Sequence, residues 1–318
     1  SNALFEEMGI HVRDASNIIL QNLHIRNVKK SGSPTSNGGD AIGMETNVNR
    51  VWIDHNWLEA SGGEKDGYDS LLDMKAGVTN VTVSYNLFND SSRAGLIGSS
   101  DSDNKNTNIT FHHNWYKNIE QRTPLIRHAL VHMYNNYWSN PRLDYMFHGI
   151  NSRSSGKVLV ENNYMYNVNN PLLASDDSPT AGCWQTNNDN TVLPEIYYSR
   201  TVGAGALVVP EVIDGQLQST CVVSVPYSVE MDPTADVPAI VMANVGVGKI
   251  DGGAGTGGNS SGGASSAANS NSSALNSSVA NSAQTTSSAA VSSVAAGANL
   301  AINEAFNVDK TTLFSAAY

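Results

Sequence analysis

The sequence predicts an all-β fold, a right-handed single-stranded parallel β-helix (a solenoid), followed by a flexible low-complexity C-terminal linker. Three observations support this fold class. A short motif recurs, its copies alternate apolar and polar residues as strands do, and each copy carries an asparagine at one position. The asparagines are 22 to 30 residues apart, a period typical of stacked coils.

The repeated motif has the form apolar-x-apolar-x-x-Asn-apolar. Its copies are VWIDHNWL (51–58), VTVSYNLF (81–88), ITFHHNWY (109–116), VHMYNNYW (131–138) and VLVENNYM (158–165), and IILQNLHI (18–25) has its asparagine one place early. The shared asparagines are Asn56, Asn86, Asn114, Asn136 and Asn163. An amide at a fixed turn can both donate to and accept from the next one, so we expect a ladder. Twenty-two residues are too few for the four strands of a propeller blade, and the regular leucines of a horseshoe repeat are missing.

Two long insertions interrupt the early repeats. They read NVKKSGSPTSNGGD (27–40) and ASGGEKDGYD (60–69). Extra residues in a coil must leave the stack outward. We therefore expect these segments to form the walls of a groove on one side of the β-helix.

Composition divides the chain into four parts. Residues 1–3 resemble a cloning remnant, and 4–251 form the expected β-helix domain, which begins later than a complete β-helix with an N-terminal cap would. Residues 252–300 are almost entirely Gly, Ser, Ala, Asn and Thr, without charge, and predict a flexible linker. Apolar periodicity returns in 301–318, which we interpret as the start of a truncated C-terminal segment.

The charge balance narrows the classes of partner. The 318 residues carry a formal net charge of -11, which argues against nucleic-acid binding, and no apolar run is long enough to span a membrane. The cysteines, Cys183 and Cys221, fit one disulfide of an exported protein, with two buried free thiols as the alternative. We expect a secreted monomer, with a periplasmic or cell-surface location as the other possibilities.

Acidic residues cluster after the two insertions. Asp40 follows two glycines, and Asp69, Asp73 and Lys75 lie in DSLLDMK, where residues two and four apart share one face of a strand. Three converging carboxylates repel one another unless a cation neutralises them, and oxygen ligands favour a hard ion such as Ca²⁺. The alternative interpretation is three solvated aspartates at loop edges.

Two arginines flank a proline in IEQRTPLIRH (119–128). Arg122 and Arg127 would point to opposite faces of a straight strand, but Pro124 indicates a bend between them. Arg93 precedes the strand-like AGLIG, and Arg153 precedes the copy at 158–165. A salt-bridged surface pair remains the alternative for Arg122 and Arg127.

Taken together, these segments carry a resemblance. VWIDHN, DSLLDMK, VTVSYNLFND, ITFHHNWYKNI, RTPLIR and LVHMYNNYW occur in the order and spacing of pectate lyases of polysaccharide lyase family 1. The resemblance covers residues 9–250. It implies a secreted, calcium-dependent enzyme that cleaves de-esterified polygalacturonate by β-elimination to 4,5-unsaturated oligogalacturonides.

The resemblance also implies roles for individual residues. Arg122 takes the place of the base that removes the C5 proton, and Asp40, Asp69 and Asp73 take the places of calcium ligands. The positions that match substrate-binding residues, or lie near them, are Lys75, Arg93, Arg127 and Arg153. Because an arginine base is neutral only at high pH, an alkaline optimum is expected.

This chain departs from the family pattern at three positions. Gly38 stands where some members have a fourth metal-binding aspartate, Arg93 stands where a lysine is usual, and Ala129 replaces a common glycine. The glycine at position 38 implies a resting metal site with only three protein ligands.

Other functions stay open on the sequence alone. A pectin lyase acting on methylated pectin, or a non-catalytic pectin-binding β-helix, is the main alternative, and a polygalacturonase-like hydrolase is a more distant one. His112 and His113 are expected to face opposite ways on a strand, which disfavours a shared zinc ion. SDSDNK (100–105) has the composition of a solvated turn, with a second ion site as the alternative.

Overall fold

The computed structural model describes residues 3–30, 38–140, 147–174, 178–187, 189–194 and 207–250. The expected linker (252–300) and C-terminal segment (301–318) lie outside the described residues, as do parts of the first insertion.

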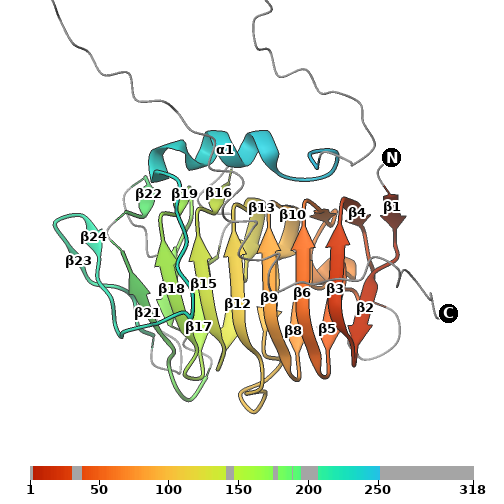
Figure 1. Ribbon diagram of the computed structural model, residues 1–318, viewed down its shortest axis with the longest axis horizontal. Helices are drawn as coiled ribbons and strands as arrows, with labels where there is room; N and C mark the ends of the chain where they lie inside the picture. The colour runs from red at the N-terminus through yellow and green to blue at the C-terminus, as the bar shows by residue number, and fades with distance from the viewer. Residues whose placement is uncertain are drawn as a thin grey trace, which may run out of the picture. The chain divides into compact units, whose positions relative to one another are not determined.

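Three parallel sheets build the fold (Figure 1). The β1 sheet contains, in spatial order, β1 (Ala3–Glu6), β4 (Leu23–Arg26), β7 (Trp57–Glu59), β10 (Leu87–Arg93), β13 (Trp115–Gln121), β16 (Tyr137–Ser139), β19 (Tyr164–Tyr166) and β22 (Thr191–Leu193). The β2 sheet contains β2 (Ile10–Arg13), β5 (Ile42–Glu45), β8 (Leu72–Lys75), β11 (Leu96–Ile97), β14 (Leu125–Arg127), β17 (Ile150–Arg153) and β20 (Leu172–Ala174). The β3 sheet contains β3 (Ser16–Gln21), β6 (Val48–Asp54), β9 (Val78–Ser84), β12 (Thr107–His112), β15 (Leu130–Tyr134), β18 (Lys157–Glu161) and β21 (Cys183–Thr186).

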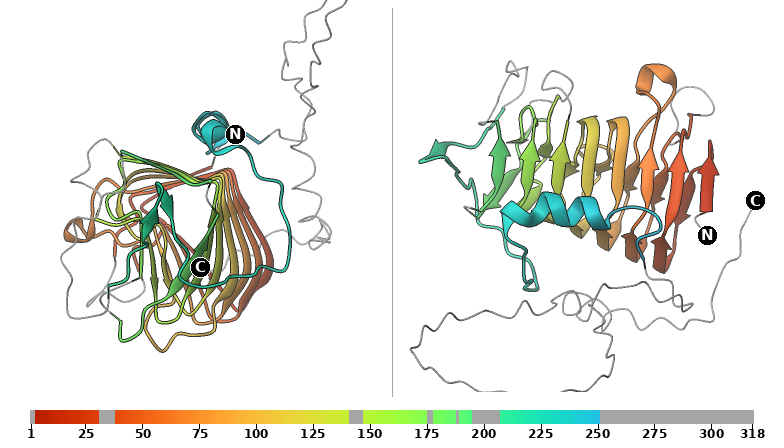
Figure 2. Two further views of the ribbon diagram at one scale, coloured as in Figure 1. Left: turned by 90° about the vertical axis from the view of Figure 1, so that its left-hand side faces the viewer. Right: turned by 90° about the horizontal axis from the view of Figure 1, so that it is seen from above.

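Neighbours within each sheet are three strands apart along the chain, so each coil supplies one strand to every sheet. The view along the stack in Figure 2 shows the coils superimposed around a common interior. This arrangement confirms the predicted parallel β-helix.

The predicted asparagine ladder is present. Each amide oxygen accepts the backbone N–H and the Nδ2–H of the asparagine in the preceding coil, at 2.9 to 3.2 Å, and Asn190 extends the series by one coil. The residue before each of the five predicted asparagines has a positive φ, as at His55 (52°) and Tyr85 (51°), which turns the chain between sheets. Each predicted strand run is therefore two strands joined at its asparagine.

Aliphatic side chains stack inside the coils. In the β3 sheet one inward row pairs residues strand by strand and consists of Val51, Val81, Ile109, Val131 and Val158. All are at most 1% exposed. Complete burial of such a side chain contributes about 1.5 to 3 kcal/mol, so these rows are the main source of stability.

The C-terminal part of the described chain covers the outside of the coils. The helix α1 (Val237–Asn244) packs Val237 and Val241 against Trp115, Tyr137 and neighbouring side chains of the β1 sheet (Figure 2). The short elements that remain are the antiparallel pair β23 (Val212–Ile213) and β24 (Gln216–Leu217), and the 3-10 turns η1 (Glu64–Asp66) and η2 (Thr234–Asp236).

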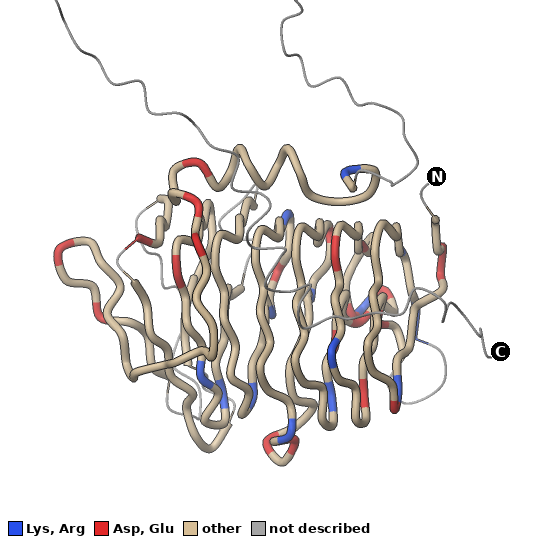
Figure 3. Tube along the Cα trace, viewed as in Figure 1, with Lys and Arg blue, Asp and Glu red and all other residues tan. Residues whose placement is uncertain are grey.

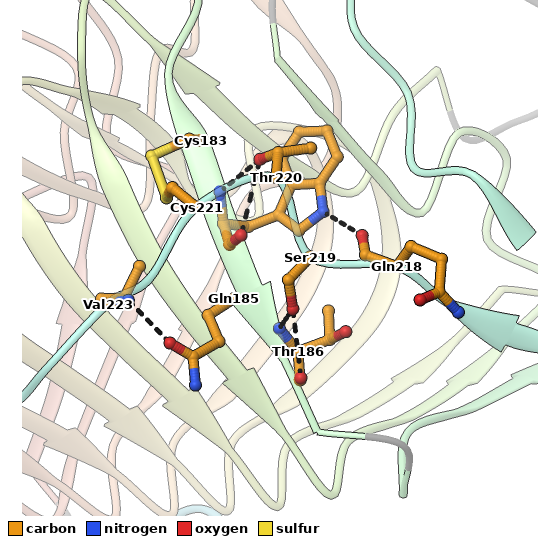
Figure 4. Close-up of a disulfide and its surroundings, with 9 residues drawn as sticks. Cys183, Gln185, Thr186, Gln218, Ser219, Thr220, Cys221 and Val223 are labelled. Atoms are coloured by element: carbon orange, nitrogen blue, oxygen red, sulfur yellow. Dashed lines mark hydrogen bonds between the residues drawn. A yellow bond between two sulfur atoms is a disulfide. The ribbon is translucent and has the colours of Figure 1, made fainter.

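Cys183 of β21 and Cys221 form the expected disulfide, 38 residues apart in sequence (Figure 4). Thr220 and Ser219 add hydrogen bonds to the backbone of Trp184 and Thr186. The bond therefore fastens the returning chain to the last strand of the β3 sheet.

The prediction that His112 and His113 face opposite ways is wrong. The strand ends at His112, and His113 has a φ of 55°, so their Nδ1 atoms approach to 2.9 Å. Within the described ranges, no group of three His, Cys, Asp or Glu side chains is placed to hold a metal ion. No helix in these ranges is long and apolar enough to cross a membrane.

Candidate active site

The candidate site lies on the outward face of the β2 sheet. Successive residues of a strand point to opposite faces, so Asp73 and Lys75 point outward while Met74 between them is buried. The register aligns Lys75 with Glu45 on one side. Ile97 pairs with both Met74 and Ile126, which places Gly98 beside Lys75 and Arg127.

Asp40 and Asp73 are held together by one ammonium group. Lys75 Nζ lies 3.3 Å from Asp40 Oδ2 and 2.8 Å from Asp73 Oδ2. Both carboxylates are 1% exposed, and they also accept backbone N–H groups of Ser70 and Leu96. Burial and the neighbouring charge of Asp73 raise the pKa of Asp40 to about 8.

Lys75 supplies the opposite charge. Burial lowers the pKa of its ammonium group, but the carboxylates of Asp73 and Asp40 outweigh burial, and the net pKa is raised. Gly43 is the residue of β5 beside Asp73, and a Cβ there would make only ordinary contact with Asp40 Oδ2, at 3.5 Å.

Asp69 is directed toward a second pair of cations. Its Oδ2 lies 3.3 Å from Lys30 Nζ, and its Oδ1 accepts from Arg93 Nη1 at 2.8 Å. Glu64 of η1 contacts both Lys30 and Arg93. Arg93 ends β10, so the second insertion folds back over the site through Glu64 and Asp69.

Arg122 lies between two strands. It follows β13, has a φ of 59°, and precedes the cis peptide of Thr123 and Pro124 that leads into β14. This bend leaves Arg122 in the turn between β13 and β14, while Arg127 lies at the end of β14. Gly95 N–H donates to the Arg122 carbonyl at 2.9 Å, and a Cβ at Gly95 would lie only 1.8 Å from the Leu72 carbonyl oxygen.

The side chain of Arg122 differs from the other cations of the site. Among the described residues its guanidinium makes no hydrogen bond or ion pair, and Arg93, Asp73, Asp69 and Arg127 are the charged groups that act on it. Burial lowers the pKa of Arg122 from its ordinary value, and Arg93 and Arg127 lower it further, against the opposing effect of Asp73 and Asp69.

Arg127 and Arg153 are partners in the register of β14 and β17. Arg127 Nη1 donates to the Gly98 carbonyl at 2.9 Å, and its Nε donates to Asp101 at 3.3 Å. Arg153 is 7% exposed at the end of its strand. The side chains that point outward from the β2 sheet at this register form a row, called the outward row, which contains Lys75, Arg127 and Arg153.

Seven of the eight residues predicted from the sequence are in contact groups or in the outward row. Asp40, Asp73 and Lys75 form one group, Asp69 and Arg93 belong to the other, and Lys75, Arg127 and Arg153 form the row. The eighth residue, Arg122, lies beside them. Sequence reasoning missed Lys30, Glu64 and Asp101, which hold Asp69, Arg93 and Arg127. Glu64 lies in the second insertion, which was expected to form a wall of the groove. This position in the sequence could have indicated that Glu64 lies near the site. Nothing in the spacing of Asp101 indicates Arg127 as its partner.

Comparison with known protein families shows to which family the chain belongs. The sequence profile of a family described as pectate lyase matches residues 1–250. The chain belongs to the pectate lyase family.

Individual pectate lyases are similar over most of this chain. A pectate trisaccharide-lyase of Bacillus licheniformis is 38% identical over 245 residues, 77% of this chain, and the chain spans 64% of that relative's length. A pectate lyase of Bacillus sp. N165, solved with trigalacturonate, is 31% identical with a TM-score of 0.61, covering 77% of this chain and 72% of the other. Pectate lyase C of Erwinia chrysanthemi, solved at pH 9.5 with 30 mM Ca²⁺, is 27% identical with a TM-score of 0.65, covering 78% and 75%.

Proposed function

We propose that this chain cleaves polygalacturonate by β-elimination in a calcium-dependent reaction, with Arg122 as the base that removes the C5 proton. The observation that carries the proposal is the contrast between Arg122 and its neighbours. Lys75, Arg93 and Arg127 are each held by a carboxylate, whereas the Arg122 side chain has no such partner in the described part of the chain. A half-buried guanidinium with a lowered pKa, close to other cations, suits a base.

The row of cations supports a polyanionic substrate. Neighbouring strands lie about 4.8 Å apart, so Lys75 and Arg127 stand roughly 10 Å apart along the stack. Such a row favours a linear chain of acidic sugars over a compact anion. The relatives support the same class, since one is named a pectate trisaccharide-lyase and another was solved with trigalacturonate.

The residues fit a calcium ion in their chemistry. Asp40, Asp69 and Asp73 offer only carboxylate oxygens, which hard divalent cations prefer. Burial, and after it the negative charge of Asp73, raise the pKa of Asp40, which supports a cation at these carboxylates, although in the described residues the three do not come together as one metal-binding group. Lys75, Lys30 and Arg93 supply positive charge to these carboxylates in the structure. When bound, the ion would supply Lewis-acid stabilisation of the charge that develops on the substrate carboxylate.

Proton removal then follows from the position of Arg122. Its neutral guanidine takes the C5 proton, the C5–H electron pair becomes the C4=C5 double bond, and the C4–O bond breaks with a proton from solvent going to the leaving oxygen. Lys75, Arg93, Arg127 and Arg153 bind sugar carboxylates. Because only the neutral guanidine accepts a proton, the rate rises with pH, and the lowered pKa of Arg122 increases the neutral fraction at any given pH.

The disulfide between Cys183 and Cys221 supports secretion, because such bonds persist in oxidising compartments. Polygalacturonate is an extracellular polymer, so secretion would bring the chain to its substrate.

An absorbance assay tests the proposed function. The chain is incubated with polygalacturonate or with highly methylated pectin, each with calcium or with excess chelator, and the ultraviolet absorbance of the unsaturated product is followed. We expect absorbance to rise only with polygalacturonate and calcium. A rise on methylated pectin that survives chelation indicates a pectin lyase, and new reducing ends without absorbance indicate a hydrolase.

A further inference from the structure

The loop after β11 is a folded unit that reaches across two coils. Residues 98–106 project beyond the turns of the coils in Figure 1 and carry both acidic and basic positions in Figure 3. Asp103 fixes the loop, because its carboxylate accepts from Ser99 N at 2.9 Å, Ala76 N at 2.9 Å and Asn106 Nδ2 at 2.9 Å. The expectation of a merely solvated turn is therefore wrong for Asp103.

Asp101 uses this fixed loop to reach the candidate active site. Its Oδ1 accepts from Ser154 Oγ at 2.5 Å, Ser178 Oγ at 2.7 Å and Arg127 Nε at 3.3 Å. Arg127 belongs to the first coil after the loop, Ser154 to the second and Ser178 to the third. The serine hydrogen bonds hold the pKa of Asp101 below its usual range, so the carboxylate is ionised under working conditions.

The same loop holds the other edge of the guanidinium. Arg127 Nη1 donates to the Gly98 carbonyl at 2.9 Å, while no contact of Nη2 is found in the described ranges. The Arg127 side chain is 15% exposed. Two donors are thus fixed by the loop, and Nη2 remains for a ligand.

We propose that Asp101 is a positioning residue that orients Arg127 toward the substrate carboxylate. Ser154 and Ser178 fix the Asp101 carboxylate, and this carboxylate fixes the Arg127 guanidinium. Because the Arg127 side chain is already ordered, it loses less conformational freedom when the sugar acid binds. Asp101 itself does not touch the substrate. This inference rests on the proposed function, because it assigns Arg127 a polygalacturonate carboxylate as its ligand.

The test compares Asp101→Ala, Asp101→Asn, Arg127→Ala and the double variant Asp101→Ala/Arg127→Ala with the wild type. Ser102→Ala, an exposed position of the same loop, is the matched control. Asp101→Ala should raise KM for polygalacturonate by about threefold to tenfold, the range of a partly exposed charge-assisted hydrogen bond, with kcat within about twofold. Asp101→Asn should stay near the wild type because its amide oxygen still accepts from both serines and Arg127. In the Arg127→Ala background, Asp101→Ala should have no further effect.

The inference is overturned if Asp101→Ala has the KM of Ser102→Ala, or if its effect is unchanged when Arg127 is absent. A calorimetric titration of trigalacturonate into the same proteins separates this result from a failure of the proposed function. If the wild type forms no unsaturated product, the proposed function fails, and weaker trigalacturonate binding by Asp101→Ala but not by Ser102→Ala still supports the positioning of Arg127. Equal binding by all three proteins overturns it.

Discussion

Lys75 and Arg127 stand two strands apart in the same outward row of the β2 sheet, with Gly98 between them. Gly98 has a φ of 89°, and a Cβ there would lie 2.9 Å from Arg127 Cβ. No side chain therefore separates the two cations, and a sugar acid can lie across both.

Replacing Gly98 by alanine tests this relationship. The positive φ costs about 1 to 2 kcal/mol for any non-glycine residue, and the contact with Arg127 adds displacement of its side chain. Gly77→Ala is the matched control, because Gly77 has a φ of 101° and its nearest neighbour would be 3.6 Å from the new Cβ. We expect both variants to melt at lower temperature, and only Gly98→Ala to raise KM for polygalacturonate. Equal KM values would show that the row does not bind the substrate.

Calcium binding should depend on Asp73. Asp73→Asn keeps the shape of the side chain but removes one negative charge, and calcium affinity follows the number of charged ligands. We expect calorimetry to show at least about a tenfold weaker affinity for the ion, by the same principle. Asp14→Asn, a change at an exposed carboxylate on another turn, is the control. Unchanged affinity in Asp73→Asn would remove Asp73 from the ligand set.

The asparagine ladder should be essential for stability. Asn114→Ala removes the acceptor of Asn86 N and Nδ2. Nδ2 keeps the carbonyls of Ile53 and Ser84, whereas the buried Asn86 N–H is left without its partner. One orphaned buried donor costs about 1 to 3 kcal/mol, and the lost hydrogen bond from Asn114 Nδ2 to the Val83 carbonyl about 1 kcal/mol more, so we expect a loss of roughly 2 to 4 kcal/mol in denaturant unfolding. Asn108→Gly is the control, because it removes one exposed hydrogen bond at a positive φ and should cost about 1 kcal/mol or less. Similar losses in both variants would contradict a special contribution of the ladder.

Acid should destabilise the fold through His112. Burial lowers the pKa of His112 well below its ordinary value, so the folded state keeps it neutral. The unfolded chain binds its proton below about pH 6.5, so the stability from this residue is complete above that pH and is lost as the pH falls below it. The rings that pack on His112 are those of Tyr85, His113 and Tyr134.

His112→Phe keeps a ring in this position and removes the titration. We expect the melting temperature to fall less steeply below pH 6.5 in this variant than in the wild type, while His11→Phe, at an exposed histidine, leaves the slope unchanged. Parallel acid profiles for His112→Phe and the wild type would assign the acid sensitivity to other groups.

The sequence was sufficient to predict the coils but not the contacts between them. The asparagines recur with the strands they connect, so Asn56 and its counterparts indicated both the repeat and the ladder. Asn190 was missed because the run before it lacks the repeated motif. Local periodicity places Asp73 and Lys75 on one face, whereas Arg127 and Asp101 meet only because a loop crosses neighbouring coils. The directions of His112 and His113 were predicted wrongly because the strand ends at His112 and His113 itself has a left-handed backbone conformation.

The rate of unsaturated product formation by Arg122→Ala is the most direct test of the central claim, that this guanidine, which has no partner among the described residues, removes the substrate proton. Loss of a general base lowers the rate roughly a hundredfold to ten-thousandfold, and calorimetric binding of trigalacturonate should stay within about fivefold of the wild type. The account predicts this separation of rate from binding at saturating calcium. A rate within about threefold of the wild type would contradict it.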